Sequence, residues 1–358
     1  MGSALAGNFA NPGTRTDHLP DAVMSRCSAT THRKALSMRW LLSFSLVSTI
    51  TVPTAGRAQV AQRVHNEILE TPTTRLELIG LKRWTLAMIQ DSLARYAPGD
   101  SLTSHACAAI LRGKLGFADA AAQYYPPGLE GQTKGYFAVP VVEPQDSARV
   151  RYRARPRDSV PDRADWAVAL ATFRQHNQVF QSAIQSPPFL LGRTHPDSVE
   201  PELAVARPLL EFLRAHRTDP DRQRALWTLA HDAGIYHRVV AAVVIAGFAA
   251  SDSTWWALAD ALRDQDGMVS ATASQVLSTL SRSAARTVNW APVTDGVRAV
   301  LDGTDLFAHN ALLDALAATK VAPALAPALL RGGGELVLAK LRSRTRSPRV
   351  RRTAFSRR

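Results

Sequence analysis

The stretch Asp266-Gly-Met-Val-Ser-Ala-Thr-Ala-Ser-Gln-Val-Leu-Ser-Thr-Leu280 is the part of this 358-residue chain that decides its fold. Its apolar residues recur at spacings of three and four, which is the period of one face of an α-helix. These residues are Val269, Ala273, Val276, Leu277 and Leu280. An Asp-Gly turn precedes the run. The stretch therefore predicts a helix that begins just after a turn and buries one face.

The same apolar pattern occurs on both sides of this stretch. It lies 32 residues earlier in His237, Ala241, Val244, Ile245 and Phe248, and 39 residues later in Ala308, Leu312, Ala315 and Leu316. Self-similarity at a period of about 30–45 residues indicates stacked helical hairpins. Small residues such as Ala241 and Ala273 let neighbouring helices approach, so we expect Ala273 at a helix–helix contact. An irregular helical bundle is the alternative.

From about Pro201 onward, short apolar helices are expected to follow one another, separated by Asp-Pro, Asp-Gly and Gly-Gly-Gly turns. The expected ranges are 203–216, 222–231, 237–249, 254–262, 269–280, 293–301 and 306–318.

Three segments of this region resemble the HEAT and armadillo class of α-solenoids. They begin at Asp219-Pro-Asp-Arg-Gln-Arg-Ala225, Asp266-Gly-Met-Val269 and Ser347-Pro-Arg-Val350-Arg351. Each is similar to the Asp or Pro turn of that class, which a Val-Arg pair and an Ala on the inner helix follow. The resemblance covers roughly 200–356 and is degenerate, since Val269 is followed by Ser. It implies a solenoid architecture and no particular activity.

Residues 59–200 have a different pattern. We expect helices over 76–96, 104–116 and 163–184. The runs 136–142 and 149–157, joined by Glu-Pro-Gln-Asp-Ser, predict a β-hairpin at about 136–157. The expected fold class is mainly α: an N-terminal helical region (59–200) carrying a short β-hairpin, then a HEAT-like solenoid over 201–358 with a basic C-terminal end.

Residues 38–58 have the layout of a secretory signal peptide. Basic residues up to Arg39 precede an uncharged, mostly apolar run over 40–52, and small residues stand at −3 and −1 of a cleavage after Ala58. The run is shorter than the roughly 20 residues of a spanning helix. We therefore expect a leader over 1–58 and an exported chain, bacterial periplasmic or extracellular; an uncleaved anchor is the alternative.

The charge distribution and the number of cysteines exclude several classes of protein. The net charge of +13 divides into +4 before residue 59, zero over 59–330 and +9 from 331 onward, so the body gives no evidence of specific nucleic-acid binding. Cys107 is the one cysteine beyond the leader, which excludes an internal disulfide and a multi-cysteine zinc site there. The C-terminal arginines 342–358 are expected to form the polar end of the solenoid or to lie against an anionic surface.

Five arginines alternate with less polar residues: Arg149, Arg151, Arg153, Arg155 and Arg157. In a strand, side chains two apart share a face, so all five charges would lie together and repel one another. Two interpretations remain open. The segment is a solvated edge strand whose neighbouring carboxylates are Asp158, Asp162 and Asp165, or it binds phosphate- or carboxylate-bearing ligands.

Other apparent motifs lack the groups their chemistry needs. Gly99-Asp100-Ser101-Leu102 is similar to the nucleophile block of GDSL esterases, but no Asp-x-x-His follows to supply a base, so a turn is the better interpretation. Cys107 is expected to be a small core residue. No His-Glu-x-x-His occurs, and 128–135 and 332–334 lack the Gly-Lys-Ser/Thr of a phosphate loop. We expect no metal and no cofactor.

The sequence as a whole favours an exported, non-enzymatic binding or scaffold protein that offers a solenoid surface to another protein, and we expect that partner to be a protein of the cell envelope. Two other classes stay open: an envelope hydrolase using 59–200, and a polyanion binder using the arginine run and the basic C-terminus. No membrane span is expected after signal removal.

Overall fold

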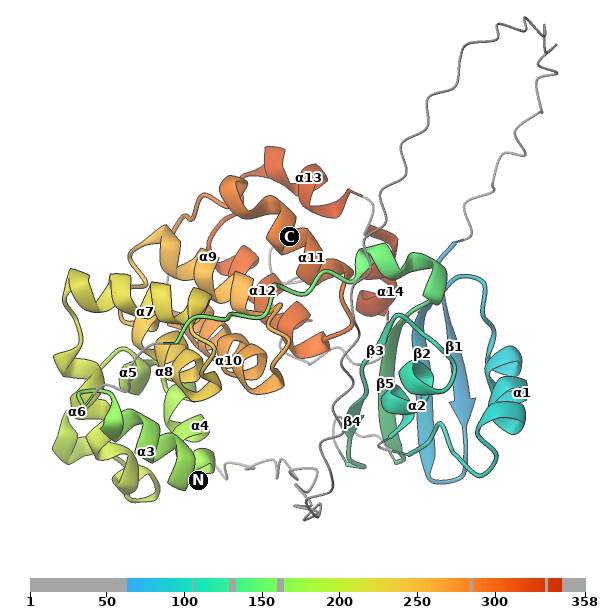
Figure 1. Cartoon of the computed structure of the whole chain (residues 1–358), viewed down its shortest axis with the longest axis horizontal. Coiled ribbons are helices and arrows are strands. Elements are labelled where there is room, and N and C mark those ends of the chain that lie inside the picture. The colour runs from blue at the N-terminus through green and yellow to red at the C-terminus, as the bar shows by residue number, and fades with distance from the viewer. Residues whose placement is uncertain are drawn as a thin grey trace, which may run out of the picture. The chain divides into compact units, whose positions relative to one another are not determined.

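The computed structural model describes residues 63–104, 106–128, 133–159, 164–283, 286–331 and 334–342. Over these residues the chain is mainly helical, with a small sheet in its N-terminal region (Figure 1). The signal-peptide region 38–58 and the arginines beyond residue 342 lie outside the described residues. None of the described helices is long and apolar enough to cross a membrane.

The sheet has five strands in the order β1-β2-β5-β3, with β4 also pairing with β5. Their bounds are His65–Glu70 (β1), Thr74–Leu81 (β2), Asp119–Ala120 (β3), Gln123–Tyr125 (β4) and Gly135–Val142 (β5). β2 and β5 are parallel, and the other pairings are antiparallel. A parallel pair needs a long crossover connection, and the segment between β2 and β5 provides it.

Each face of this sheet is covered by helix. Helices α1 (Leu86–Tyr96) and α2 (Cys107–Gly113) share one core with Leu76, Leu78 and Phe137. The opposite face, with Ile79, packs with Ala339 of α14 (Gly334–Arg342). Gly80 permits this approach, because a Cβ there would lie 2.7 Å from Leu336 Cδ1 and its φ is +96°.

Three expectations for the N-terminal region are wrong. Residues 76–81 of the expected helix 76–96 belong to β2, since their alternation places leucines on one sheet face. The expected helix 163–184 is two helices, α3 (Ala167–Gln175) and α4 (Asn177–Gln185), interrupted at His176 with φ −133°. The expected hairpin at 136–157 does not form: β5 is a strand, but a 3₁₀ helix η2 (Pro144–Arg149) and an extended segment follow it.

The rest of the described chain is helical. Its elements are α5 (Pro187–Leu190), η3 (Pro196–Ser198), η4 (Pro201–Ala206), α6 (Arg207–Ala215), α7 (Asp219–His231), α8 (Ile235–Ala246), α9 (Asp252–Ala261), α10 (Gly267–Ser283), η5 (Ala291–Val293), α11 (Thr294–Asp302), α12 (Leu306–Ala318), η6 (Pro323–Leu325) and α13 (Ala326–Leu330). Between residues 203 and 318, each helix expected from the sequence is found within a few residues of its predicted bounds.

These helices pack in a regular order. Helix α10 contacts both α8 and α12, while α9 contacts α7 and α11, and α11 contacts α13. Ala241 of α8 and Ala273 of α10 are fully buried in the same core, as expected of small residues between helices. Helices α8, α10 and α12 therefore form one row. A turn precedes each of them, and these turns follow α7, α9 and α11.

Candidate functional site

Residues 150–159, the connecting segment, run from η2 across the ends of α12, α10 and α8 (Figure 1). Backbone hydrogen bonds join the segment to two of the turns. The amide of Arg153 donates to the carbonyl of Arg263 at 3.0 Å, before α10. The amide of Asp158 donates to His231 O at 3.1 Å, and the amide of Ala233 donates to Asp158 O at 2.6 Å, before α8.

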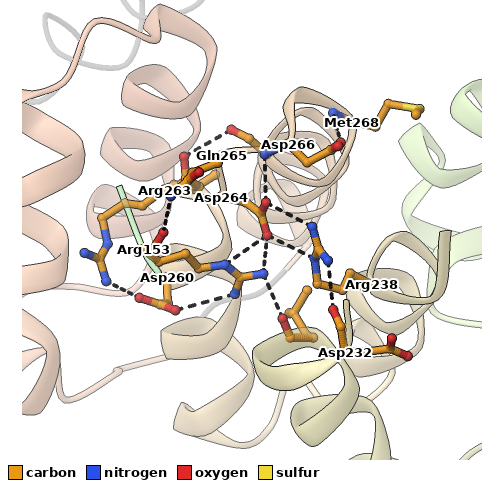
Figure 2. Close-up of polar contacts among 12 residues, drawn as sticks. Arg153, Asp232, Arg238, Asp260, Arg263, Asp264, Gln265, Asp266 and Met268 are labelled. Carbon is orange, nitrogen blue, oxygen red and sulfur yellow. Dashed lines mark hydrogen bonds and ion pairs between the residues drawn. The ribbon is translucent and has the colours of Figure 1, made fainter. Parts of the chain in front are cut away.

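Arg153 is the most deeply buried anchor of this segment. Its Nε donates to Asp264 Oδ2 at 2.9 Å, and Nη2 donates to the same oxygen and to Leu229 O, the latter at 2.8 Å (Figure 2). Only 8% of the Arg153 side chain and 2% of the Asp264 side chain are exposed. Removing one partner of an ion pair this deeply buried lowers the free energy of unfolding, because the other partner is left as a buried, uncompensated charge.

Asp264 also holds a second guanidinium. Arg238 of α8 donates from Nε to Asp264 Oδ2 at 3.1 Å and from Nη2 to Oδ1 at 3.2 Å. Its Nη1 donates to the carbonyls of Asp232 and Ala233 (Figure 2). One carboxylate therefore joins the connecting segment, the turn before α10 and helix α8; Asp260 lies 3.6 Å from Arg153 Nη1 as a second, more exposed carboxylate.

The five arginines singled out in the sequence thus have different environments. Arg151 pairs with Asp302 at 3.2 Å, and Arg149 lies 3.8 Å from Asp146. Arg155 and Arg157 are exposed and make no ion pair within the described residues. The expected single charged face of a strand is absent from 149–157, because this segment pairs with helix turns instead of a neighbouring strand.

The neutralising carboxylates also differ from those expected. Asp165 contacts His216 and Arg224, and Asp158 bonds through its backbone, while Asp162 lies outside the described residues. The partners are instead Asp264 and Asp302, more than 100 residues away in sequence. Sequence reasoning missed them, although a buried aspartate recurs at the end of α7, α9 and α11 or within three residues after it: Asp232, Asp264 and Asp302.

A second polar cluster, centred on the buried carboxylate of Asp119, lies beside the first. Asp119 Oδ2 accepts from the hydroxyls of Tyr152 at 2.8 Å and Thr304 at 2.7 Å. Burial, together with the Asp119 carboxylate, raises the pKa of Tyr152. Nearby, Lys340 of α14 donates to Leu301 O at 3.0 Å and to Gly303 O.

Lys340 is buried among groups of both signs. Burial, followed by the positive charge of Arg149, lowers its pKa to about 7, although Asp302, Asp305 and Asp119 oppose the shift. Burial, followed by Lys340, holds the pKa of His309 well below its ordinary value. Of these groups, Lys340 joins α14 to the end of α11 through its hydrogen bonds to Leu301 O and Gly303 O.

Large apolar side chains are exposed at the same edge, and one of them, Tyr236, lies with its ring centroid 4.8 Å from the guanidinium carbon of Arg174. Tyr236, Met268 and Phe307 are each the second residue of α8, α10 or α12, and they are 38%, 40% and 49% exposed. They stand 32 and 39 residues apart, as the repeated pattern does. Met268 points away from the buried network in Figure 2. Together with Tyr152, 49% exposed on the connecting segment, they form what we call the turn-edge surface.

The possible catalytic side chains, Ser101, Cys107 and His237, lie on separate elements of the structure. The Ser101 hydroxyl contacts Thr103 Oγ1 at 2.8 Å within an exposed turn, as expected, although α2 begins later, at Cys107. Cys107 is fully buried and burial raises its pKa to about 11, which confirms a core residue. His237 Nδ1 lies 2.8 Å from Asp232 Oδ2.

Within the described ranges, no three His, Cys, Asp or Glu side chains are grouped to hold a metal ion. Comparisons of the chain with protein-family models, with curated proteins and with solved structures find no match.

Proposed function

We propose that this chain is an exported, non-enzymatic binding protein whose helices form a HEAT-like array, and that its turn-edge surface binds a protein partner in the cell envelope. The observation that carries the proposal is the recurrence of an exposed large apolar residue at the same position of α8, α10 and α12.

Two features support a repeated array over an irregular bundle. The first is the packing order, in which α8, α10 and α12 form one row and α7, α9, α11 and α13 the other. The second is the recurrence of a buried aspartate at the end of α7, α9 and α11 or within three residues after it, ahead of each helix of the first row. In stacked hairpins each unit contacts its neighbours, and equivalent positions fall along one edge.

The chemistry of the turn-edge surface suits a protein partner. Tyr, Met, Phe and Arg are enriched at protein interfaces, and Arg155 and Arg157 extend the apolar row with two exposed charges. The connecting segment, which carries Tyr152, is fixed in position because Arg153 is hydrogen-bonded to Asp264. A preorganised surface loses less conformational entropy on binding.

Site-specific photo-crosslinking in the native host tests the surface. A crosslinker at Met268 or Phe307 should give the same discrete adduct, and Phe307→Asp should reduce the adduct formed from position 268 at least fivefold. Val205 in η4, 49% exposed, is the matched control and should not give this adduct. Equal adducts from positions 205 and 268, or none from 268, would show that the partner binds elsewhere.

Export is tested separately. The mature protein from the native host should begin at Gln59, or within a residue or two of it, in the exported fraction. Recovery of the intact leader 1–58 on cytoplasmic protein would contradict export without bearing on the crosslinks.

A further inference from the structure

Three arginines meet near the end of α8 that is remote from the turn-edge surface. Arg193 lies in the loop after α5, Arg214 is in the last turn of α6, and Arg217 follows that helix. No carboxylate among the described residues pairs with any of the three. This distinguishes them from Arg153 and Arg238, whose charges face Asp264.

Two glycines make room for the Arg217 side chain. A Cβ on Gly247 would lie 1.9 Å from Arg217 Nη1, and a Cβ on Gly192 would lie 2.7 Å from Arg217 Nη2. The same Cβ on Gly192 would lie 3.1 Å from Cγ of Arg214, so that side chain passes the same glycine. The guanidinium of Arg217 is therefore held between two stretches of backbone that carry no side chain there.

One donor group of this guanidinium is left without an acceptor. Arg217 Nη2 is shielded from solvent and has no hydrogen-bond partner in the described structure. The last carbonyls of α8, those of Val244 and Ile245, accept from the amides of Gly247 and Phe248 instead. A shielded, unsatisfied charged donor is destabilising unless something binds it.

The charges around Arg217 also favour binding of an anion. Burial, followed by the charge of Arg193, lowers the pKa of Arg217, so this guanidinium is partly desolvated and lies in a positive environment. An anion at this place would relieve both the missing hydrogen bond and the repulsion between the arginines.

We propose that Arg193, Arg214 and Arg217 form a binding site for a phosphate group. Guanidinium groups bind phosphate oxygens through paired, charge-assisted hydrogen bonds, and three positive charges suit a dianion better than a single carboxylate. Gly247 and Tyr236 are at opposite ends of α8, roughly 17 Å apart at about 1.5 Å per residue. The site is therefore separate from the proposed protein-binding surface and does not depend on it.

Equilibrium dialysis of the full chain against radiolabelled inorganic phosphate, at constant ionic strength set with potassium chloride, tests the site. We expect one phosphate per chain and at least tenfold weaker binding in Arg217→Gln. Arg207→Gln, at an exposed arginine in the first turn of α6, removes the same charge away from the site; it is the control and should bind as the unmodified chain does. Equal binding in Arg217→Gln and the control, or no phosphate bound to the unmodified chain, would overturn the proposal.

Gly247→Ala tests the geometry without removing a charge. Its backbone is compatible with alanine, so the new methyl group should displace the Arg217 side chain and weaken phosphate binding at least fivefold, with circular dichroism unchanged. Unchanged binding in a folded Gly247→Ala protein would contradict the assigned position of Arg217. O-phosphoserine competition, with serine as control, distinguishes a site that accepts phosphomonoesters from one for free phosphate alone.

Discussion

The two ends of α8 place arginines in opposite situations. At the N-terminal end, Arg238 and Arg153 share the buried carboxylate of Asp264. At the C-terminal end, Arg217 lies between two glycines and faces Arg193. A guanidinium that meets a buried carboxylate is part of the fold, whereas one that meets another cation is available to a ligand. The number of arginines in a segment does not decide between the two; the placement of aspartates does.

The largest effect is expected from breaking the paired end. Asp264→Asn removes the negative charge between two buried guanidinium groups, and loss of one member of a buried pair lowers the free energy of unfolding by about 3–5 kcal/mol. Chemical denaturation of the full chain measures it. Asp295→Asn is the control, because the Asp295 side chain is 87% exposed and pairs only with Arg298; we expect a change of about 0.5 kcal/mol or less. Similar losses in both variants would show that Asp264 is not buried as described.

Lys340 is intermediate between the paired arginines and the unpaired Arg217. It is buried near carboxylates, but its hydrogen bonds go to backbone carbonyls. Its pKa in the folded state is lowered from 10.5 to about 7. Between these values the unfolded chain binds the proton that the folded chain lacks, so the unfolding free energy rises with pH from about 7 to 10.5 and does not change further below 7. Lys340 contributes up to about 1.4 kcal/mol per pH unit to the rise in unfolding free energy.

Lys340→Met should therefore flatten the rise in unfolding free energy between pH 7 and pH 9. Lys114→Met, at an exposed lysine after α2, should leave the rise unchanged. The comparison uses slopes, because the substitution also removes hydrogen bonds to the α11 carbonyls at every pH. A slope that persists in Lys340→Met would mean that the lysine stays protonated in the fold and belongs with the paired arginines.

The helices from 203 to 318 could be predicted closely because their signals are local. Periods of three and four residues define α10 and α12; Asp266 and Asp305 mark the beginnings of these two helices, and Thr218 marks that of α7. The core position of Cys107 followed from its small apolar neighbours. Local periodicity does not determine the sheet, however: the strand residues of β2 are separated from those of β5 by more than fifty residues, and their leucines also fit a helix.

The site was harder to predict for the same reason. The alternation of Arg149 to Arg157 indicated an extended backbone, and 150–159 is extended, but alternation does not reveal what an extended segment pairs with. Asp264 lies in a turn and Asp302 is the last residue of α11, and in the sequence both look like parts of ordinary Asp-containing connections. The signal that could have found them is their recurrence, with Asp232, before three similar helices. Arg217 gave no sequence signal, since its isolation depends on two glycines brought together by folding.

The smallest effect is expected at the unpaired end of the connecting segment. Arg155 and Arg157 are exposed and pair with no described carboxylate, so changing both to Gln should alter the unfolding free energy by about 0.5 kcal/mol or less. Changing Arg151 and Arg153 to Gln instead should destabilise the fold by several times that amount, because Asp302 and Asp264 would lose their partners. Both pairs change net charge equally, so any difference in denaturation midpoint reports burial and pairing alone. If the Arg155 and Arg157 pair proved equally destabilising, the distinction between paired and free arginines would fail within this one segment. If it left stability unchanged but weakened the crosslink from Met268, the two charges would belong to the partner-binding surface.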